Sequence, residues 1–241
     1  MNRISNFIEE ERHFYSDYDD NIFMLALSQV SRYYRFLDVI MDRYTTAGEQ
    51  LRDATREQML AVESGASFIP QLQLDKQIHL GILVHLEIES FYIFAKIFLA
   101  KVALFLERYF GQLRNARLLS HAKLAKHIEA YAEQKQLAVD GALLRQIATL
   151  ETVICNYRDK QISHHYNLRT IHATSWQSEG GVKISSIAFY PKPTDTQNSS
   201  DDLICLFRDI EQYVNLILSL VAENRARTAL QLKSSTQHPE S

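Results

Sequence analysis

The sequence predicts an all-α protein, a helical bundle with one small β-hairpin inserted near residues 170–190. Three observations lead to this fold class. Glycine and proline, which interrupt helices, number only 7 and 4 among 241 residues, against a usual share of about 12 per cent. No proline occurs between Pro70 and Pro191. Apolar residues recur at three- and four-residue spacing, as on the buried face of a helix.

Two helices are expected first along the chain. An acidic or amide residue at positions 19–21 caps a helix that runs to about Thr46, and Gly48 ends it. A second, more polar helix is expected over 49–62. The segment 68–73 around Pro70 then reads as a loop.

The longest predicted helix spans about Asp75–Phe110. Its apolar residues lie on nearly every side, which is typical of the centre of a bundle, and Gly111 ends it. A basic amphipathic helix is expected over 114–136. Another helix is expected over 142–165, after a turn at 139–141.

The hairpin is predicted by two β-favouring runs, 171–176 and 182–190, that flank a Glu-Gly-Gly turn. The polar segment 191–200 reads as a linker. Asp201 or Asp202 caps the final helix. Its apolar stripe is expected at Leu203, Leu206, Ile210, Tyr213, Ile217 and Leu220.

We expect three parts: a helical extension 1–70 packed on the bundle, a helical domain 71–234 that carries the hairpin, and a disordered tail 235–241. The most apolar segment, 78–106, is interrupted by charged residues, so no uncharged run approaches the ~20 residues that a bilayer requires. Three glutamates at 9–11 stand where a secretion signal needs apolar residues. A cytoplasmic protein without a membrane span is expected.

Several classes of site are excluded by pattern. The sequence has no glycine-rich phosphate loop after a strand, no zinc-protease histidine pair and no nucleophile elbow. Cys155 and Cys205 are too few for a thiolate cluster. His121 and His127 stand about 120° apart round a helix, and we expect both on the surface. No metal and no cofactor are therefore expected.

Basic residues gather over 114–126, where no acid occurs, although the net charge of the chain is −3. Such a cluster is either a solvated helix face or a track for nucleic-acid phosphates, since cations gain free energy by releasing counterions from a polyanion. The candidate RNA-phosphate contacts are Arg114, Arg117, Lys123 and Lys126.

A polar seam follows the long helix at heptad steps, with His85, Glu89, Tyr92 and Lys96. Because an unpaired buried charge costs several kcal/mol, Glu89 and Lys96 should each face a partner or a wet cleft. The seam is either a structural network or half-exposed face, or it lines a site in which Glu89 orients a basic residue.

The residues most suited to chemistry lie at 157–166, which reads Tyr-Arg-Asp-Lys-Gln-Ile-Ser-His-His-Tyr. Arg158, followed by Asp159 and then by His164 six positions after the arginine, resembles the signature of the HEPN superfamily. The resemblance implies an α-helical bundle, commonly a homodimer, and in many members a metal-independent ribonuclease of toxin and antitoxin pairs, phage defence or RNA processing. It covers roughly 75–220 in architecture.

The chemistry of these residue types agrees with that family. Arg158 can clamp a phosphate with paired donors. His164 can exchange a proton with a ribose 2′-hydroxyl or a leaving 5′-oxygen, so RNA would give a 2′,3′-cyclic phosphate and DNA would be refused. Asp159 would fix the arginine or the helix end. His165 is a second candidate, because it stands within about 20° of Arg158 round a helix.

The run His164, His165, Tyr166 is similar to the His-x-Tyr ending of one toxin branch, whose tyrosine is adenylylated by a partner nucleotidyltransferase. The resemblance implies that Tyr166 is a candidate modification site and that such an antitoxin is a candidate partner. The alternative is a non-catalytic dimerisation, adaptor, nucleotide-binding or RNA-binding module, in which these residues only complement the helix dipole.

Overall fold

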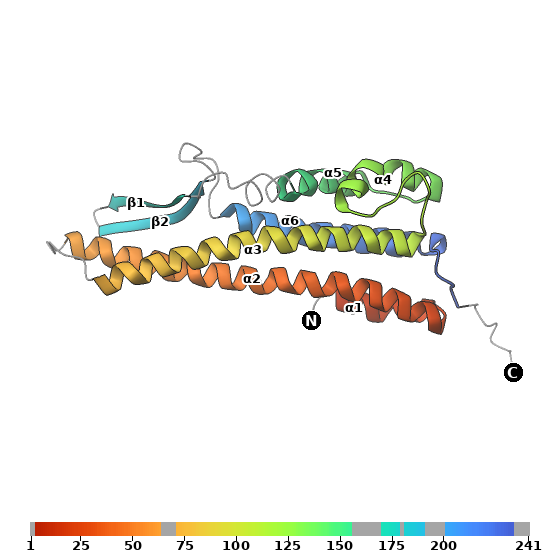
Figure 1. Ribbon diagram of the computed structural model, residues 1–241, viewed down its shortest axis with the longest axis horizontal. Coiled ribbons are helices and arrows are strands. Elements are labelled where there is room, and N and C mark those ends of the chain that lie inside the picture. Colours follow the sequence, from red (N-terminus) through yellow and green to blue (C-terminus); the bar gives the residue numbers. More distant parts are fainter. Residues whose placement is uncertain (1–2, 64–70, 156–169, 179–180, 191–200, 234–241) are drawn as a thin grey trace. The chain divides into compact units, whose positions relative to one another are not determined.

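The computed structural model describes residues 3–63, 71–155, 170–178, 181–190 and 201–233, and these are mostly helical, which confirms the all-α class (Figure 1). The helices and strands are α1 Arg3–Glu11, α2 Asp17–Glu63, α3 Gln71–Phe110, α4 His121–Lys135, α5 Gly141–Leu150, a π-helix Glu151–Cys155, β1 Thr170–Ser178, β2 Gly181–Tyr190 and α6 Asp201–Glu223. Short 3₁₀ turns at Arg12–Phe14 and Arg225–Arg227 follow α1 and α6.

The two strands pair antiparallel, with Ile171 opposite Phe189 and a register shift between Thr174 and Ser175. The predicted runs 171–176 and 182–190 fall within them. Positions 179 and 180 of the expected turn lie outside the described residues, so a hairpin closed there stays a prediction. The linker 191–200 and the tail 235–241 also lie outside them.

The chain forms two compact units, and α2, α3 and α6 each contribute to both. The first unit contains 1–35, 95–154 and 209–241, and the second contains 36–94 and 155–208. The domain boundary expected near residue 70 falls at residues 64–70, outside the described part, and stays a prediction.

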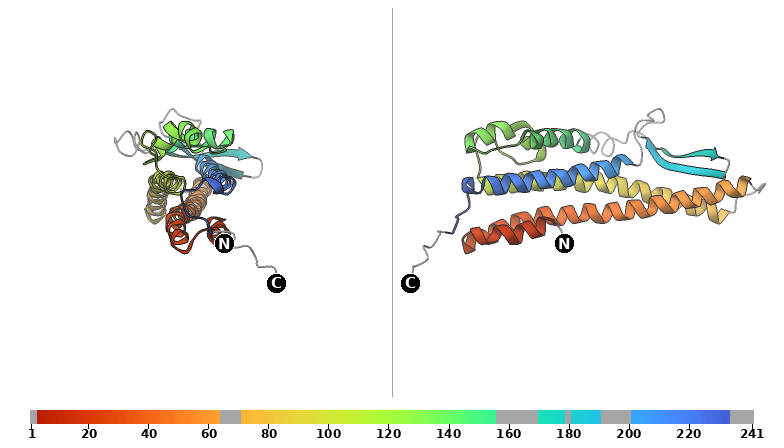
Figure 2. Two further views of the ribbon diagram at one scale, coloured as in Figure 1. Left: turned by 90° about the vertical axis from the view of Figure 1, so that its right-hand side faces the viewer. Right: turned by 180° about the vertical axis from the view of Figure 1, so that it is seen from behind.

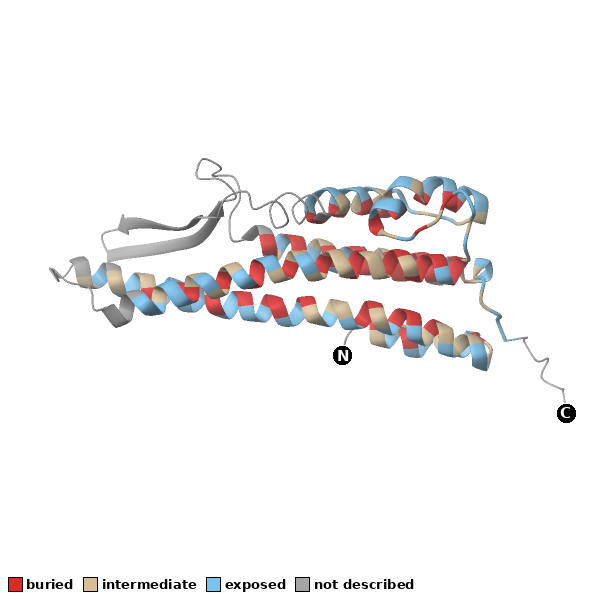
Figure 3. Cartoon of the chain, in the orientation of Figure 1, coloured by how far each residue is buried: buried red, intermediate tan, exposed pale blue. Residues whose placement is uncertain are grey.

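An aromatic core fills the first unit. Tyr15 and Tyr109 are buried and their hydroxyls lie 2.8 Å apart. Phe23 and Phe105 pack against the Tyr109 ring, with centroids 6.1 and 5.8 Å away. Figure 3 shows buried residues along the facing sides of the helices in this unit, and Figure 2 shows α3 and α6 side by side.

Residues early and late in the chain join in the first unit. Glu11 at the end of α1 is 5% exposed, and Arg225 Nε donates to its Oε2 at 2.8 Å. The same guanidinium lies 3.7 Å from the centroid of the Phe14 ring. The Ser16 N–H donates to the Gln231 carbonyl at 2.9 Å. Helix α1, which we did not predict, is therefore anchored by contacts remote in sequence.

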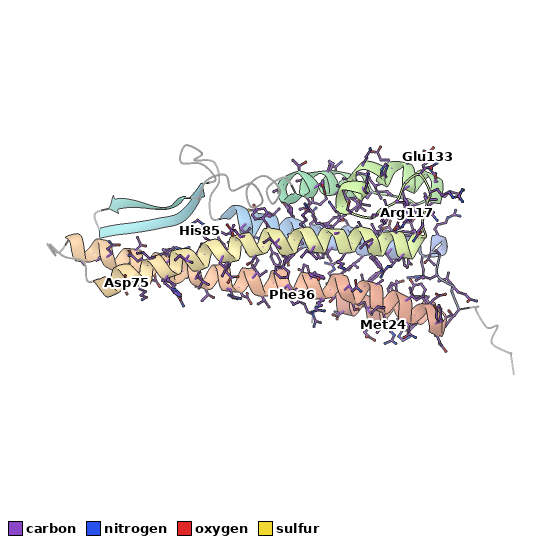
Figure 4. All side chains as sticks on the ribbon, in the orientation of Figure 1. Met24, Phe36, Asp75, His85, Arg117 and Glu133 are labelled. Atoms are coloured by element: carbon purple, nitrogen blue, oxygen red, sulfur yellow. The ribbon has the colours of Figure 1, made fainter. Side chains whose placement is uncertain are left out.

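The second unit packs the C-terminal part of α2 on the N-terminal part of α3. Phe36 and Phe94 meet edge to face, with centroids 5.4 Å apart, and Gln77 Nε2 donates to the Ala54 carbonyl at 3.0 Å. Figure 4 shows the side chains along this part of α3, between the labels Asp75 and His85. No helix of the described residues has an apolar stretch of the length that a bilayer crossing needs.

One boundary predicted for α2 and one predicted for α3 were wrong. Gly48 does not end a helix, because α2 continues to Glu63. A glycine inside a helix costs only about 1 kcal/mol relative to alanine, and the burial of Tyr44 and Leu51 on either side offsets that cost. Helix α3 begins at Gln71, four positions before the expected start at about Asp75, so residues 71–73 of the expected loop are helical.

Candidate functional site

The HEPN-like motif lies within 156–169, outside the described residues. The roles expected for Arg158, Asp159, His164, His165 and Tyr166 therefore stay predictions. The described helical segment that precedes the motif ends at Cys155, three positions before Arg158.

Helix α5 is fixed by its cap and by one apolar face. The Asp140 side chain accepts from the Ala142 N–H at 2.8 Å, which satisfies a free donor of the first turn. Gln146 Nε2 donates to the Asp209 carbonyl of α6 at 3.1 Å. The buried residues of the helix, at four- and three-residue spacing, are Leu143, Ile147 and Leu150.

The segment Glu151–Cys155 that follows α5 is a π-helix. A π turn inserts one residue relative to an α-helix, so it shifts the side chains on its two sides by roughly 100° round the axis. Ile154 is fully buried, whereas Thr152 and Val153 are exposed. The helix predicted over 142–165 is thus α-helical and then π-helical up to Cys155. Such π turns frequently occur at functional sites.

A buried histidine of α4 holds the first residue of this π-helix. His121 is 2% exposed, and its Nδ1 lies 2.7 Å from Glu151 Oε2. Its ring packs edge-on against the Tyr213 ring of α6, with centroids 5.7 Å apart. These three residues form what we name the His121 cluster, which joins α4, the π-helix and α6.

The His121 cluster has the form of an oriented base, but the imidazole is buried and Glu151 is only half-buried. A carboxylate on Nδ1 leaves Nε2 as the reactive nitrogen. Both His121 Nε2 and the Tyr213 hydroxyl are buried, and neither has a hydrogen-bond partner among the described residues. Burial, and secondarily the charge of Glu151, raises the pKa of Tyr213, which keeps its phenol neutral. We therefore assign the cluster to holding the π-helix in place.

The prediction that His121 lies on the surface was wrong, whereas His127 is half-exposed. His121 shares the buried face of α4 with Leu124, Ile128 and Tyr131. These apolar residues follow it by three, seven and ten positions, which is helical spacing. That spacing is the sequence signal that could have identified the cluster.

The two supporting residues expected on α3 differ in exposure. Glu89 belongs to the second unit and is exposed, while Lys96 belongs to the first unit and is half-buried. The exposure of Glu89 agrees with the half-exposed alternative for the seam. Its expected role in orienting a basic residue of the motif stays a prediction.

The buried carboxylates of α3 are Glu87 and Glu107 instead. Arg43 Nη2 lies 2.5 Å from Glu87 Oε1, so the two side chains form an ion pair. Uncompensated burial of a carboxylate is costly, so the arginine of α2 is needed to offset the burial of this one.

Glu107 forms an ion pair with Arg117, which is one of the predicted RNA-phosphate contacts. Arg117 Nε donates to Glu107 Oε1 at 2.6 Å, and the Leu118 N–H donates to the same oxygen at 2.9 Å. Burial tends to raise the pKa of Glu107, but these donors outweigh it and lower the pKa. The Arg117 charge is therefore already paired within the fold.

The helix start predicted at Arg114 was wrong. Helix α4 begins at His121, and Ser120 caps it by accepting from the Lys123 N–H at 3.3 Å. Arg114 is exposed in the preceding segment, and Lys123 and Lys126 are exposed on α4. These three residues present their charges to solvent, and their contact with RNA stays a prediction.

Within the described ranges, no three histidine, cysteine, aspartate or glutamate side chains gather as metal ligands would. Comparison of the chain with protein-family models, with curated proteins and with solved structures finds no match.

Proposed function

We propose that this chain is a HEPN-type, metal-independent endoribonuclease. The observation that carries the proposal is the sequence Arg158, Asp159 and His164 in a mostly helical chain, directly after α5 and the π-helix and before α6. Two copies of the chain would combine, so that the arginine and histidine of each contribute to one RNA groove.

The reaction needs three actions at one phosphodiester. Arg158 binds the phosphate and stabilises the negative charge that develops on phosphorus. His164 takes the proton of the 2′-hydroxyl, whose oxygen attacks phosphorus while the bond from phosphorus to the 5′-oxygen breaks. Water supplies the proton with which the 5′-oxygen leaves. The products are a 2′,3′-cyclic phosphate and a 5′-hydroxyl. His165 is the alternative base, and Asp159 holds the arginine.

The exposed cations Arg114, Lys123 and Lys126 would attract RNA phosphates through their charge. Arg117 contributes less to this binding, since its guanidinium is paired with Glu107. RNA affinity should therefore fall with rising salt and should be weakened more by Lys123→Ala than by Arg117→Ala in a protein of unchanged fold.

The experiment uses purified chain, EDTA, and single-stranded and structured RNA. Cleavage is expected for the natural protein, with loss of at least 100-fold in rate for Arg158→Ala and His164→Ala. His127→Ala, which removes a half-exposed histidine of α4, is the matched control. A substrate with a single 2′-deoxy nucleotide at the cut should resist. Equal cleavage by His164→Ala would remove that residue from the mechanism. His165 would then be the candidate base, and His165→Ala would test it.

Tyr166 is the candidate modification site that the similarity to the toxin branch implies. A partner nucleotidyltransferase of this kind, if one is encoded next to this chain, should add AMP to Tyr166 on co-expression and relieve growth inhibition. Intact-mass measurement detects the adduct, and Tyr166→Phe is the control. An adduct on another residue contradicts the assignment.

A non-catalytic dimerisation or adaptor module is the second candidate, favoured by exposed aliphatic side chains along α3. Thermal stability separates the two functions. If Arg158→Ala and His164→Ala each lower Tm by many degrees, the residues hold the fold; if Tm is kept and RNA cleavage is lost, they act on RNA.

A further inference from the structure

The segment that follows α6 and its 3₁₀ turn lies along the link between α1 and α2. Thr228–Lys233 runs beside Phe14, Tyr15 and Ser16, and we name it the C-terminal strap. Leu232 of the strap and Tyr15 of the link form an antiparallel bridge. Both segments belong to the first unit, and Figure 1 shows the strap leaving the end of α6 and passing the N-terminal end of α2.

The base of the strap is anchored on α3. The Ala229 N–H and the Thr228 hydroxyl both donate to the Tyr109 carbonyl, at 2.7 and 2.8 Å. The Leu230 N–H donates to the Thr228 hydroxyl oxygen at 3.1 Å. Tyr109 is buried near the end of α3, so the core holds the backbone to which the base is bound. The strap therefore begins at a fixed point.

The tip of the strap, residues 231–233, is bound through its main chain. The Ser16 N–H donates to the Gln231 carbonyl at 2.9 Å, and the Lys233 N–H donates to the Phe14 carbonyl at 2.8 Å. The side chains of the tip are all exposed. Because release of the tip uncovers little apolar surface, it should cost far less free energy than the unfolding of a helix.

Two carboxylates in the first turn of α2 also contact the tip. The Gln231 N–H donates to Asp19 Oδ2 at 2.8 Å, and Lys233 Nζ lies 3.7 Å from Asp17 Oδ1. Asp17 and Lys233 are both exposed, and an ion pair in water contributes little to stability. The main-chain bonds are therefore the main attachment of the tip.

The position of α1 depends on the link that the tip binds. Helix α1 has 9 residues, and an isolated helix of that length is not stable in water. Its buried residues Ile4 and Ile8 must therefore stay packed on the rest of the unit. Phe14 and Ser16, whose main chain is bound by the tip, lie between the end of α1 and the start of α2.

We propose that the C-terminal strap is a conformational device: its tip opens while its base stays on Tyr109, and this opening loosens α1. When the tip is open, the Ser16 N–H and the Phe14 carbonyl bind water. Helix α1 then keeps its apolar contacts and the pair of Glu11 with Arg225, but its link to α2 is no longer fixed. The inference does not rest on the ribonuclease proposal, because no motif residue takes part in it.

Amide hydrogen exchange of the full chain, followed residue by residue by NMR, tests the proposal. The amides of Ser16 and Lys233 should share protection factors at least about 100-fold below that of Phe105 in the core of α3, because the tip opens without the helices. The amide of Ala229, in the base, should be protected more strongly than both amides of the tip.

Lys233→Pro is the decisive variant. Proline has no N–H, so the bond to the Phe14 carbonyl is lost while an extended backbone is still allowed. The protection of Ser16 should fall about tenfold and that of Ile8 about threefold, whereas Phe105 should not change. Lys233→Ala is the matched control, because it removes the ammonium group and keeps the N–H. It should leave the protection of Ser16 within about twofold of the natural value.

Four results would overturn the proposal. Equal protection of Ser16 and Phe105 in the natural chain would mean that the tip does not open by itself. An equal fall in Lys233→Ala and Lys233→Pro would mean that the ammonium group holds the tip. Unchanged protection of Ile8 in Lys233→Pro would mean that the strap does not hold α1. A loss of helical circular dichroism in that variant would mean that the strap unfolds only together with the core.

Discussion

His121 Nδ1 lies 2.7 Å from Glu151 Oε2, which ties the first turn of α4 to the π-helix that ends three positions before Arg158. The contact crosses 30 positions of sequence and is made by a side chain that is 2% exposed. The structural element nearest to the motif in sequence is therefore held by a polar contact as well as by apolar packing.

Removal of this histidine should destabilise the protein. We expect His121→Ala to lower the free energy of unfolding by about 2–4 kcal/mol, because it removes a hydrogen bond and leaves a cavity beside Tyr213. Urea unfolding followed by circular dichroism measures the change. His127→Ala, at a half-exposed position of the same helix, should cost less than about 0.5 kcal/mol. Equal stability of the two variants would show that the His121 cluster does not hold the π-helix.

The Glu107 pair should make stability depend on acid pH. The pKa of Glu107 is lowered in the folded protein, by donors that outweigh burial. Its folded pKa therefore lies below its unfolded value of about 4.3, so the carboxylate contributes stability above that pH and loses it as the pH falls through the folded pKa.

We therefore expect Glu107→Gln to cost about 1–2 kcal/mol at pH 7 and distinctly less near pH 3. Urea unfolding at both pH values measures this difference. The control is Glu129→Gln, which changes an exposed residue of α4. A cost that stays constant across the pH range would mean that Glu107 is not ionised in the folded protein.

Replacement of Gly48 and of Gly111 by alanine should change the stability of the protein in opposite directions. A Cβ at Gly48 would meet nothing within 4 Å, so Gly48→Ala should stabilise α2 by about 0.5–1 kcal/mol. Gly111 has φ +83° and a Cβ there would lie 3.0 Å from Lys135 Nζ, so Gly111→Ala should destabilise. Thermal unfolding measures both changes. A loss of stability in Gly48→Ala would contradict the uninterrupted course of α2.

Four buried tyrosines should resist ionisation until the protein unfolds. Burial raises the pKa of Tyr15, Tyr109, Tyr131 and Tyr213. Because each folded pKa lies above the unfolded value of about 10, the stability from these groups is complete below pH 10 and is lost as the pH rises.

Absorbance titration at alkaline pH should therefore show a fraction of the 12 tyrosines that ionises only together with the loss of helical circular dichroism. Tyr213→Phe should reduce that late fraction by one residue. If all 12 tyrosines ionised before the helical circular dichroism was lost, the buried phenols would reach solvent in the folded state.

The sequence predicted helices best where apolar spacing was uninterrupted. The final helix begins at Asp201, as expected, and the whole predicted stripe from Leu203 to Leu220 is buried. The predicted helix end at Gly48 was wrong. The local preference of glycine, about 1 kcal/mol, is smaller than the free energy gained by burying the residues around it.

The candidate site was less accessible to sequence reasoning. The segment that holds Arg117 had no acid of its own, yet Glu107, ten positions earlier, binds it once the chain turns after α3. His121 was placed on the surface because a polar side chain was judged by its type and not by its position on an apolar face. The motif at 158–164 was identified by letters alone, and its geometry lies outside the described residues.

The pairing of Glu11 with Arg225 has a consequence for biosynthesis. The two residues are 214 positions apart, and the adjoining contacts of Phe14 and Ser16 also require chain beyond residue 230. At a synthesis rate of about 5–20 residues per second, the nascent first helix must wait roughly 10 to 40 s for its partner to be translated. During that interval Glu11 has no Arg225 to pair with, so completion of this corner is a late event in folding.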